Sequence, residues 1–247
     1  MNGRAALRIA GLFLLFALMG PLHIVTRALT GGSRWPRRFL AAVTRILGVR
    51  VRLEGKAVDR HTMLLSNHIS WLDIPVLAGA TGCAFVAKDE LGHPFIHWLA
   101  DQNATVYVKR SHVRGAKDQA VAIARSLERE QPVAIFPEAT TGPGAYLLPF
   151  RSTLLEAVKY AAKDVEIRPV AIDYGNAAIE IAWWERSGRD NVLQLLGRRG
   201  TLPVVVHVLD PLDRRADRKT LASAAHEGIA RRLGLTSGNH SPISGEK

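Results

Sequence analysis

From Gly48 onward, short apolar runs rich in β-branched residues alternate with longer segments of helical pattern. The runs that predict strands are 49–53, 63–66, 84–87, 105–108, 133–136, 170–174, 179–182 and 204–209. Between them, the spacing of apolar residues predicts helices at 72–80, 94–100, 113–129, 151–162 and 218–233. Strands that alternate with helices indicate an α/β fold, and unbroken apolar strands are typical of a sheet covered on both faces. We therefore expect a mixed, largely parallel sheet flanked by helices.

Two helical segments precede this alternation. The first, Ile9 to Leu22, is uncharged and almost wholly apolar, but it is shorter than the roughly 20 residues that span a bilayer. The second, Trp35 to Leu47, combines apolar residues at helical spacing with three arginines. One apolar and one basic amphipathic helix favour a segment that associates with a membrane, either spanning it or lying in its interface. A buried core helix is the alternative for the first segment.

These patterns divide the chain into three parts. Residues 1–48 form the membrane-associating helices, with Gly31-Gly32-Ser33 as the hinge between them. Residues 49–235 form the α/β domain. Residues 236–247 are rich in Ser and Gly and predict a flexible tail.

The composition of the chain indicates a binding partner of negative charge. The 247 residues carry a formal net charge of +11, and the sequence pI is about 10.4. Such a balance suits nucleic acid, an anionic membrane surface or a phosphorylated substrate. Trp183-Trp184 has no recognised nucleic-acid motif beside it, so we expect no nucleic-acid partner. The single cysteine, Cys83, lies in an apolar run and predicts a buried, inert thiol.

One short segment, Ser66 to Asp73, carries the strongest chemical signal. His68 and Asp73 stand five residues apart, so a general base and the carboxylate that fixes its tautomer can meet within eight residues. Ser70-x-x-Asp73 is equally a capping pattern, in which the carboxylate bonds back to the start of a helix. Spacing alone leaves both interpretations open, and they are compatible.

Three further segments could take part in binding. Lys109 and Arg110 end a predicted strand, where ligands bind in α/β sheets. Residues 136–142, Phe-Pro-Glu-Ala-Thr-Thr-Gly, form a loop that can present hydroxyls and backbone N–H groups to an anion. An apolar strand opened by proline follows Arg168.

In this order, the four segments resemble the glycerolipid acyltransferase family, which includes the 1-acylglycerol-3-phosphate O-acyltransferases. The resemblance covers about Val51 to Leu209, and 86–91 and 149–151 also match family features. It implies that His68 is the base and Asp73 its partner. It also implies that the acceptor is held by Lys88, Arg110, Glu138, Thr140, Thr141 and Arg151.

The resemblance also implies the co-substrates and the location. The acyl group comes from acyl-CoA or acyl carrier protein, with no bound cofactor and no metal. The acceptor is a lysolipid, and the amino-terminal helices dock on the cytoplasmic face of the inner membrane. His93-x-x-x-His97 has the spacing of metal ligands, but Pro94 lies between them and three convergent ligands are the usual minimum.

Two residues depart from the family pattern Phe-Pro-Glu-Gly-Thr-Arg. Ala139 replaces the glycine, which is acceptable unless the backbone there needs a positive φ, and Thr141 replaces the arginine. We expect 1-acylglycerol-3-phosphate as the acceptor. Lyso-ornithine lipid is the alternative, because the Thr-Thr-Gly loop resembles the branch that acylates it. A non-catalytic protein that binds anionic membranes and a hydrolase that passes the acyl group to water are the remaining hypotheses.

Overall fold

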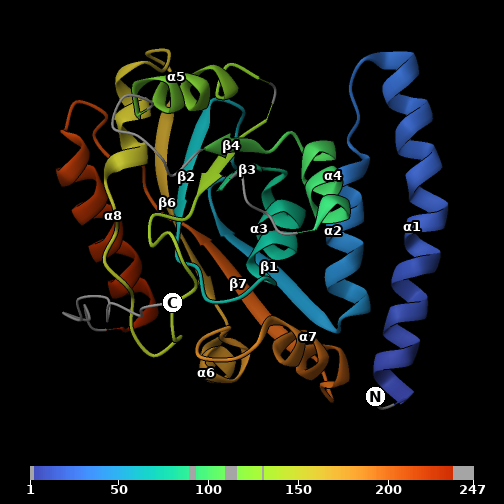
Figure 1. Ribbon diagram of the computed structural model, residues 1–247. Helices are drawn as coiled ribbons and strands as arrows, with labels where there is room; N and C mark the ends of the chain where they lie inside the picture. Colours follow the sequence, from blue (N-terminus) through green and yellow to red (C-terminus); the bar gives the residue numbers. More distant parts are fainter. Residues whose placement is uncertain (1–2, 89–92, 109–115, 130, 236–247) are drawn as a thin grey trace.

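A seven-stranded sheet forms the centre of the protein in a computed structural model, which describes residues 3–88, 93–108, 116–129 and 131–235 (Figure 1). The strand order is β1-β7-β6-β2-β5-β3-β4, and every neighbouring pair is parallel except β6 and β7. The strands are β1 (Val49–Gly55), β2 (Thr62–Ser66), β3 (Ala84–Lys88), β4 (Val106–Val108), β5 (Val133–Ile135), β6 (Glu166–Asp173) and β7 (Leu202–Val208). The predicted mixed, largely parallel sheet is confirmed.

Helices cover both faces of this sheet. They are α1 (Gly3–Thr30), α2 (Trp35–Ile46), α3 (Asp73–Thr81), α4 (Pro94–Gln102), α5 (Ala116–Ser126), α6 (Ala178–Ile181), α7 (Gly188–Gly197) and α8 (Arg218–Leu233), with 3-10 helices η2 (Thr153–Lys159) and η3 (Gly175–Ala177). In Figure 1, α1, α2 and α3 lie on one side of the sheet, and α5, η2 and α8 lie on the other.

The residues of β2 show how the sheet is buried. Leu64 belongs to the apolar cluster shared with α2 and α3, whereas Met63 and Leu65 belong to the cluster shared with α5 and α8. Successive strand residues point to opposite faces, so a strand with both faces covered is apolar throughout. All five residues of β2 are buried. Cys83 is also fully buried, and burial raises the pKa of its thiol to about 12.

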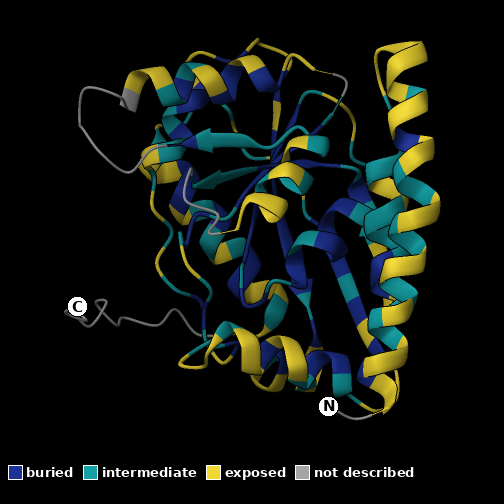
Figure 2. Ribbon diagram, turned by 45° about the vertical axis from the view of Figure 1, so that its right-hand side comes forward, coloured by how far each residue is buried: buried dark blue, intermediate teal, exposed yellow. Residues whose placement is uncertain are grey.

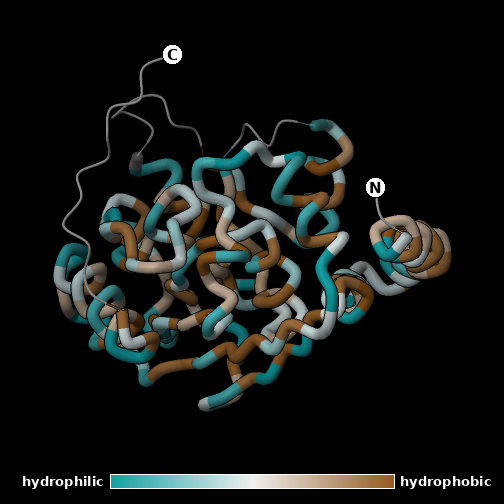
Figure 3. Tube along the Cα trace, turned by 90° about the horizontal axis from the view of Figure 1, so that it is seen from below, coloured by the Kyte–Doolittle hydropathy of each residue, from teal (hydrophilic) through white to brown (hydrophobic). Residues whose placement is uncertain are grey.

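Helix α1 extends well beyond the apolar run that predicted it. It has 28 residues and is long and apolar enough to cross a membrane, yet most of its length is not buried. Figure 2 shows that much of the helix is exposed. Its exposed large apolar residues are Leu7, Phe13, Leu14, Leu18, Leu22, Ile24, Val25 and Leu29. Figure 3 shows this mainly hydrophobic helix at the side of the molecule. The alternative of a buried core helix is therefore wrong.

One predicted element has the wrong type and one helix was not predicted. Residues 179–182 lie in and after the short helix α6 instead of a strand. Helix α7 begins after Ser187, whose hydroxyl oxygen accepts a hydrogen bond from the backbone N–H of Asp190 at 3.1 Å. That contact is an ordinary N-cap. Asn191 of α7 is fully buried and donates to the carbonyls of Ile181 and Ala182, so tertiary packing holds the two helices together.

Candidate active site

Polar side chains gather where β2, β5 and β6 end. These neighbouring strands are parallel, so their carboxyl ends meet at one edge of the sheet. The segment after β2 carries His68 and Asp73, the loop after β5 carries Glu138, and Tyr174 directly follows β6. Ligands of open α/β sheets bind outside such strand ends, which makes this edge the candidate active site.

His68 and Asp73 are in direct contact. The distance between Nδ1 of His68 and Oδ2 of Asp73 is 2.8 Å, and the Asp73 side chain is completely buried. An ionised carboxylate can only accept, so Nδ1 carries the hydrogen and Nε2 presents its lone pair. Within the described ranges, Nε2 has no hydrogen-bond partner. The ring of Phe136 stacks on the imidazole with centroids 4.1 Å apart and fixes its plane.

Asp73 also bonds back to the segment before α3, as the capping pattern predicted, although Leu72, the N-cap residue of α3, makes no side-chain cap hydrogen bond. Its Oδ2 accepts hydrogen bonds from the backbone N–H of Ile69 at 2.7 Å and of Ser70 at 2.9 Å. Ser70 Oγ in turn accepts from the backbone N–H of Leu72. The two interpretations of the segment therefore hold together, because one carboxylate orients the imidazole and fixes the turn into α3.

Four hydrogen bonds, two from the Asn67 side chain and two between backbone groups, hold the His68 segment in place. The side-chain amide of Asn67 bonds both the N–H and the carbonyl of Ile172 in β6, at 2.8 and 3.0 Å. The carbonyl of His68 accepts from the N–H of Gly142 at 2.7 Å, and the carbonyl of Ile69 accepts from the N–H of Trp183 at 2.7 Å. His68 therefore lies on a segment that is hydrogen-bonded to β6, to the Glu138 loop and to the segment after α6.

The Glu138 side chain holds the same segment through a backbone hydrogen bond. Its Oε1 accepts from the backbone N–H of His68 at 2.6 Å, and its Oε2 accepts from the N–H of Leu148 at 3.0 Å. The residue is only 2% exposed, and burial raises its pKa to about 8. A Cβ on Gly142 would lie 3.0 Å from Oε2, closer than an ordinary van der Waals contact, so a side chain there would press on the carboxylate. Both carboxylate oxygens face backbone, and contact between Glu138 and an acceptor stays a prediction.

The loop after Glu138 is fixed by two side chains. Lys88 donates from Nζ to the carbonyl of Ala139 at 2.7 Å, and Thr141 donates from its hydroxyl to the carbonyl of Trp183 at 2.7 Å. Ala139 has a φ of 60°, so the family glycine is replaced by alanine at a position that does use a positive φ. Thr140 is exposed beside it.

The remaining predicted binding residues are placed less closely. Arg151 donates its backbone N–H to the carbonyl of Pro137 at 2.9 Å, which brings it beside the start of the Glu138 loop, and its side chain is exposed. Arg110 lies outside the described residues. The roles of both in binding stay predictions. Among residues that the structure describes, no group of three His, Cys, Asp or Glu side chains could hold a metal ion.

The arrangement is suited to moving a proton at Nε2. A neutral imidazole with a buried carboxylate behind it can accept a proton from a hydroxyl and be stabilised as the imidazolium. Residues 49–173, which contain His68, Asp73, Glu138 and the strands that carry them, match the family described as acyltransferase. The chain belongs to the acyltransferase family.

Three relatives that match most of this acyltransferase are lyso-ornithine lipid O-acyltransferases. A lyso-ornithine lipid O-acyltransferase of Rhodobacter capsulatus is 32% identical, covering 96% of this chain and 92% of the relative. That of Rhizobium meliloti is 34% identical over 81% of this chain and 75% of the relative. A 1-acyl-sn-glycerol-3-phosphate acyltransferase of Neisseria meningitidis is 31% identical over 56% and 53%. The chain is thus an acyltransferase of lysolipids.

A solved structure shares the fold. The 1-acyl-sn-glycerophosphate acyltransferase of Thermotoga maritima superposes with a TM-score of 0.59, covering 95% of this chain and all of that one, at 23% sequence identity. At this identity the similarity shows the fold and not the substrate.

Two residues of the site were not expected from the sequence. Tyr174 donates its hydroxyl to Oδ1 of Asp73 at 2.6 Å, and Phe136 stacks on His68. Phe136 was part of the quoted loop motif, but a phenylalanine in an apolar strand gives no sign of its neighbour. Tyr174 is 101 residues from Asp73 along the chain, so only the pairing of β6 with β2 brings them together.

Proposed function

We propose that this enzyme transfers a fatty acyl group from an acyl thioester to the free hydroxyl of a lyso-ornithine lipid. The observation that carries the proposal is the set of relatives with this activity that match most of the chain, at 96%, 80% and 81% coverage. The 1-acylglycerol-3-phosphate enzymes match about half of it. This reverses the order of the two acceptors expected from the sequence.

The loop geometry supports this choice. Where the family pattern has an arginine, Thr141 uses its hydroxyl to bond the carbonyl of Trp183. Lys88 likewise donates to a backbone carbonyl, that of Ala139. An acceptor whose head group is an amino acid needs fewer cations than one with a phosphate monoester. The second candidate, 1-acylglycerol-3-phosphate, is favoured by the net charge of +11.

The proposed chemistry follows from the His68–Asp73 contact. Nε2 of His68 removes the proton of the acceptor hydroxyl as its oxygen attacks the thioester carbonyl carbon. The tetrahedral intermediate then expels the thiolate, the carbon–sulfur bond breaks, and the imidazolium returns the proton to sulfur. Asp73 holds the tautomer and stabilises the imidazolium, and general base assistance of this kind contributes ~10²–10⁴-fold in rate. The thioester is carried by coenzyme A or acyl carrier protein.

We also propose that the outer side of α1 and the exposed residues of α4 contact the cytoplasmic face of the inner membrane. Three apolar residues of α4 are each at least 39% exposed, and they are Phe95, Ile96 and Trp98. The ring centroid of Phe16 in α1 lies 5.7 Å from that of Phe95 and 6.1 Å from that of Trp98. The two helices therefore contact each other through aromatic rings, and each also exposes large apolar side chains. A helix that buries one face in the lipid boundary fits this arrangement.

A single assay tests the reaction and the acceptor together. Purified protein is given lyso-ornithine lipid or 1-acylglycerol-3-phosphate with acyl-CoA or acyl carrier protein, and products are identified by mass spectrometry. We expect acylated ornithine lipid. Phosphatidic acid would favour the second acceptor, free fatty acid would indicate a hydrolase, and no product with retained lipid binding would indicate a non-catalytic protein.

The catalytic pair is tested in the same assay. We expect His68→Ala and Asp73→Asn to lower turnover by at least ~100-fold, in line with loss of general base catalysis. His61→Asn is the matched control, because His61 lies just before β2, at the opposite end of the strand, and bonds the carbonyl of Leu127. Near wild-type turnover of His68→Ala would refute the mechanism.

A further inference from the structure

The Asp73 carboxylate has two oxygens, and the described residues use them differently. Oδ2 receives three donors, which are the imidazole of His68 and the backbone N–H groups of Ile69 and Ser70. Oδ1 receives one, the hydroxyl of Tyr174, at 2.6 Å. A charge-assisted O–H···O⁻ bond of this length is among the stronger hydrogen bonds in proteins.

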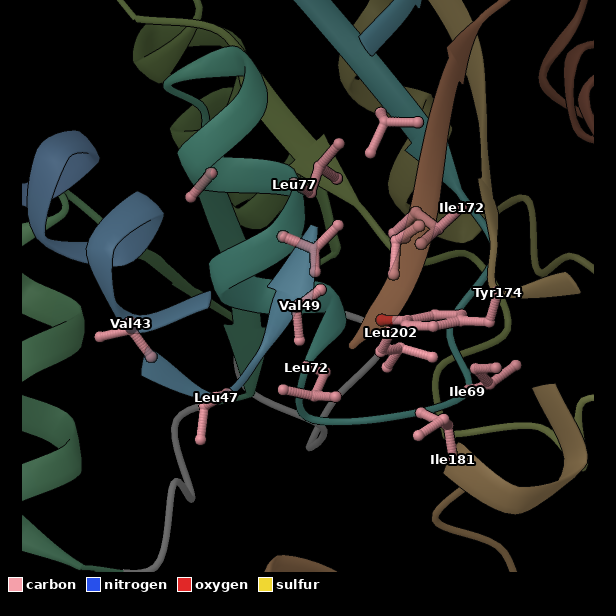
Figure 4. Packing of buried hydrophobic residues seen from close by; sticks show 14 of the residues in the cluster. Val43, Leu47, Val49, Ile69, Leu72, Leu77, Ile172, Tyr174, Ile181 and Leu202 are labelled. Carbon is pink, nitrogen blue, oxygen red and sulfur yellow. The ribbon is translucent and has the colours of Figure 1, made fainter. Parts of the chain in front are cut away.

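The ring of Tyr174 is otherwise surrounded by hydrocarbon. The residue is 3% exposed and belongs to the cluster that contains Ile69, Ile181 and Leu202. Figure 4 shows its ring among these apolar side chains, with the hydroxyl oxygen as its one polar atom. A phenylalanine would fill the same space, so packing does not explain the hydroxyl. What the hydroxyl adds is the contact with Asp73.

Tyr174 is held at a fixed point of the sheet. It follows β6 directly, and the double hydrogen bond between Asn67 and Ile172 sets the position of β6 against the segment that carries His68. The hydroxyl also stays protonated, because burial, followed by the nearby charge of Asp73, raises the pKa of Tyr174 well above its ordinary value. It is therefore a donor throughout the range in which enzymes are assayed.

We propose that Tyr174 is a positioning residue that acts through Asp73. Its hydroxyl fixes Oδ1 of that carboxylate, and this sets the orientation of the His68 imidazole and the negative charge that Asp73 presents to it. Tyr174 is buried, and its hydroxyl contacts Asp73. The inference rests on the proposed role of His68 as the base.

The effect on His68 has a definite direction. Without the hydroxyl, Oδ1 loses its donor and the carboxylate holds more negative charge toward the imidazole. A more negative partner stabilises the imidazolium relative to the neutral imidazole. Of the neighbouring titratable groups, Glu138 accepts from the backbone N–H of His68 and Lys88 donates to the carbonyl of Ala139, and neither hydrogen bond involves Tyr174.

The test is Tyr174→Phe, with Ile181→Val as control. Ile181 is fully buried in the same cluster, so its variant perturbs the packing and leaves the hydroxyl in place. For Tyr174→Phe we expect kcat to fall by about 10–100-fold, as for other partners that orient a functional ligand, with KM unchanged. The acid limb of log kcat/KM should move to higher pH, whereas the packing control should leave it in place.

Two outcomes would overturn the inference. One is a Tyr174→Phe enzyme with wild-type kcat and an unmoved acid limb. The other is a loss of activity that follows only the folded fraction, as in Ile181→Val. If His68→Ala also retains activity, the proposed function fails as well, whereas an inactive His68→Ala beside a normal Tyr174→Phe rejects the role of Tyr174 alone.

Discussion

Ala139 combines a Cβ with a φ of 60° in the loop that carries Glu138. For an L-residue the left-handed conformation costs roughly 1–2 kcal/mol, which glycine does not incur. We expect Ala139→Gly to leave the free energy of unfolding unchanged or to raise it by up to about 1 kcal/mol, measured by urea denaturation.

The control for this substitution is an ordinary alanine. Ala122 is exposed within α5, where glycine should lower the free energy of unfolding by about 0.5–1 kcal/mol. Equal destabilisation by Ala139→Gly and Ala122→Gly would mean that the loop alanine is not strained.

Glu138 predicts a pH dependence of stability. Burial raises its pKa to about 8 from an ordinary 4.5, so folding favours the neutral acid. The stabilisation of the folded state by the neutral acid is complete below the pKa of Glu138 in the unfolded chain. It is lost as the pH rises through the folded-state pKa of about 8. We expect the stability advantage of the wild type over Glu138→Gln to shrink between pH 6 and pH 9, measured by denaturation at each pH. A constant difference across that range would contradict the shifted pKa.

At the residue scale, the sequence identified contacts that are local. His68 and Asp73 are five residues apart, so one turn brings them together whatever the rest of the fold does. The contact between Tyr174 and Asp73 spans 101 residues and depends on which strands pair. Hydrophobic periodicity predicts that β2 and β6 exist but not that they are neighbours, and Tyr174 therefore could not be placed.

At the element scale, α2 and α3 cross at a glycine. A Cβ on Gly79 of α3 would lie 2.9 Å from the Cα of Ala41 in α2, which is backbone and cannot move aside. We expect Gly79→Ala to force the helices apart and to lower the free energy of unfolding by about 1–3 kcal/mol, measured by thermal and urea denaturation.

A second helical glycine gives the opposite expectation. At Gly228 of α8 the nearest atom to a new Cβ is a side-chain carbon of Leu209 at 3.5 Å, an ordinary contact. Gly228→Ala should therefore raise stability by up to about 1 kcal/mol through helix propensity. If both variants changed stability by the same amount, propensity and not the α2–α3 contact would decide the effect.

Two of the correctly predicted strands, β2 and β5, show when an element can be predicted from its own sequence. Strands β2 and β5 are buried on both faces and read as unbroken apolar runs, so their sequence carries the signal by itself. Residues 179–182 carry β-branched residues at alternating positions but fold as α6, because Asn191 and the cap at Ser187 build a helical pair there. Tertiary contacts overrode local propensity at that point.

At the scale of the whole molecule, α1 is hydrogen-bonded to α7 and α4 near its two ends. Arg8 donates to the carbonyls of Leu195, Leu196 and Arg198 at the end of α7, and His23 bonds Gln102 of α4 at 3.1 Å. A helix held at both ends runs along the domain, with its outer side free. This arrangement favours a helix lying in the membrane interface over one that crosses the bilayer.

That geometry predicts which residues control membrane binding. Phe13 and Leu18 of α1 are 71% and 61% exposed, and inserting two such side chains into lipid contributes roughly 1.5–3 kcal/mol each. We expect Phe13→Glu with Leu18→Glu to weaken partitioning onto anionic vesicles by at least about tenfold in a flotation assay, a change of ~1.4 kcal/mol. Turnover of a lysolipid presented in detergent micelles should be retained, because neither residue contributes to the catalytic pair. The control places the same two glutamates on the far side of the sheet, at exposed Ala122 of α5 and Ser223 of α8, where vesicle binding should change little. Equal loss in both variants would mean that net charge, and not the outer side of α1, holds the enzyme on the membrane.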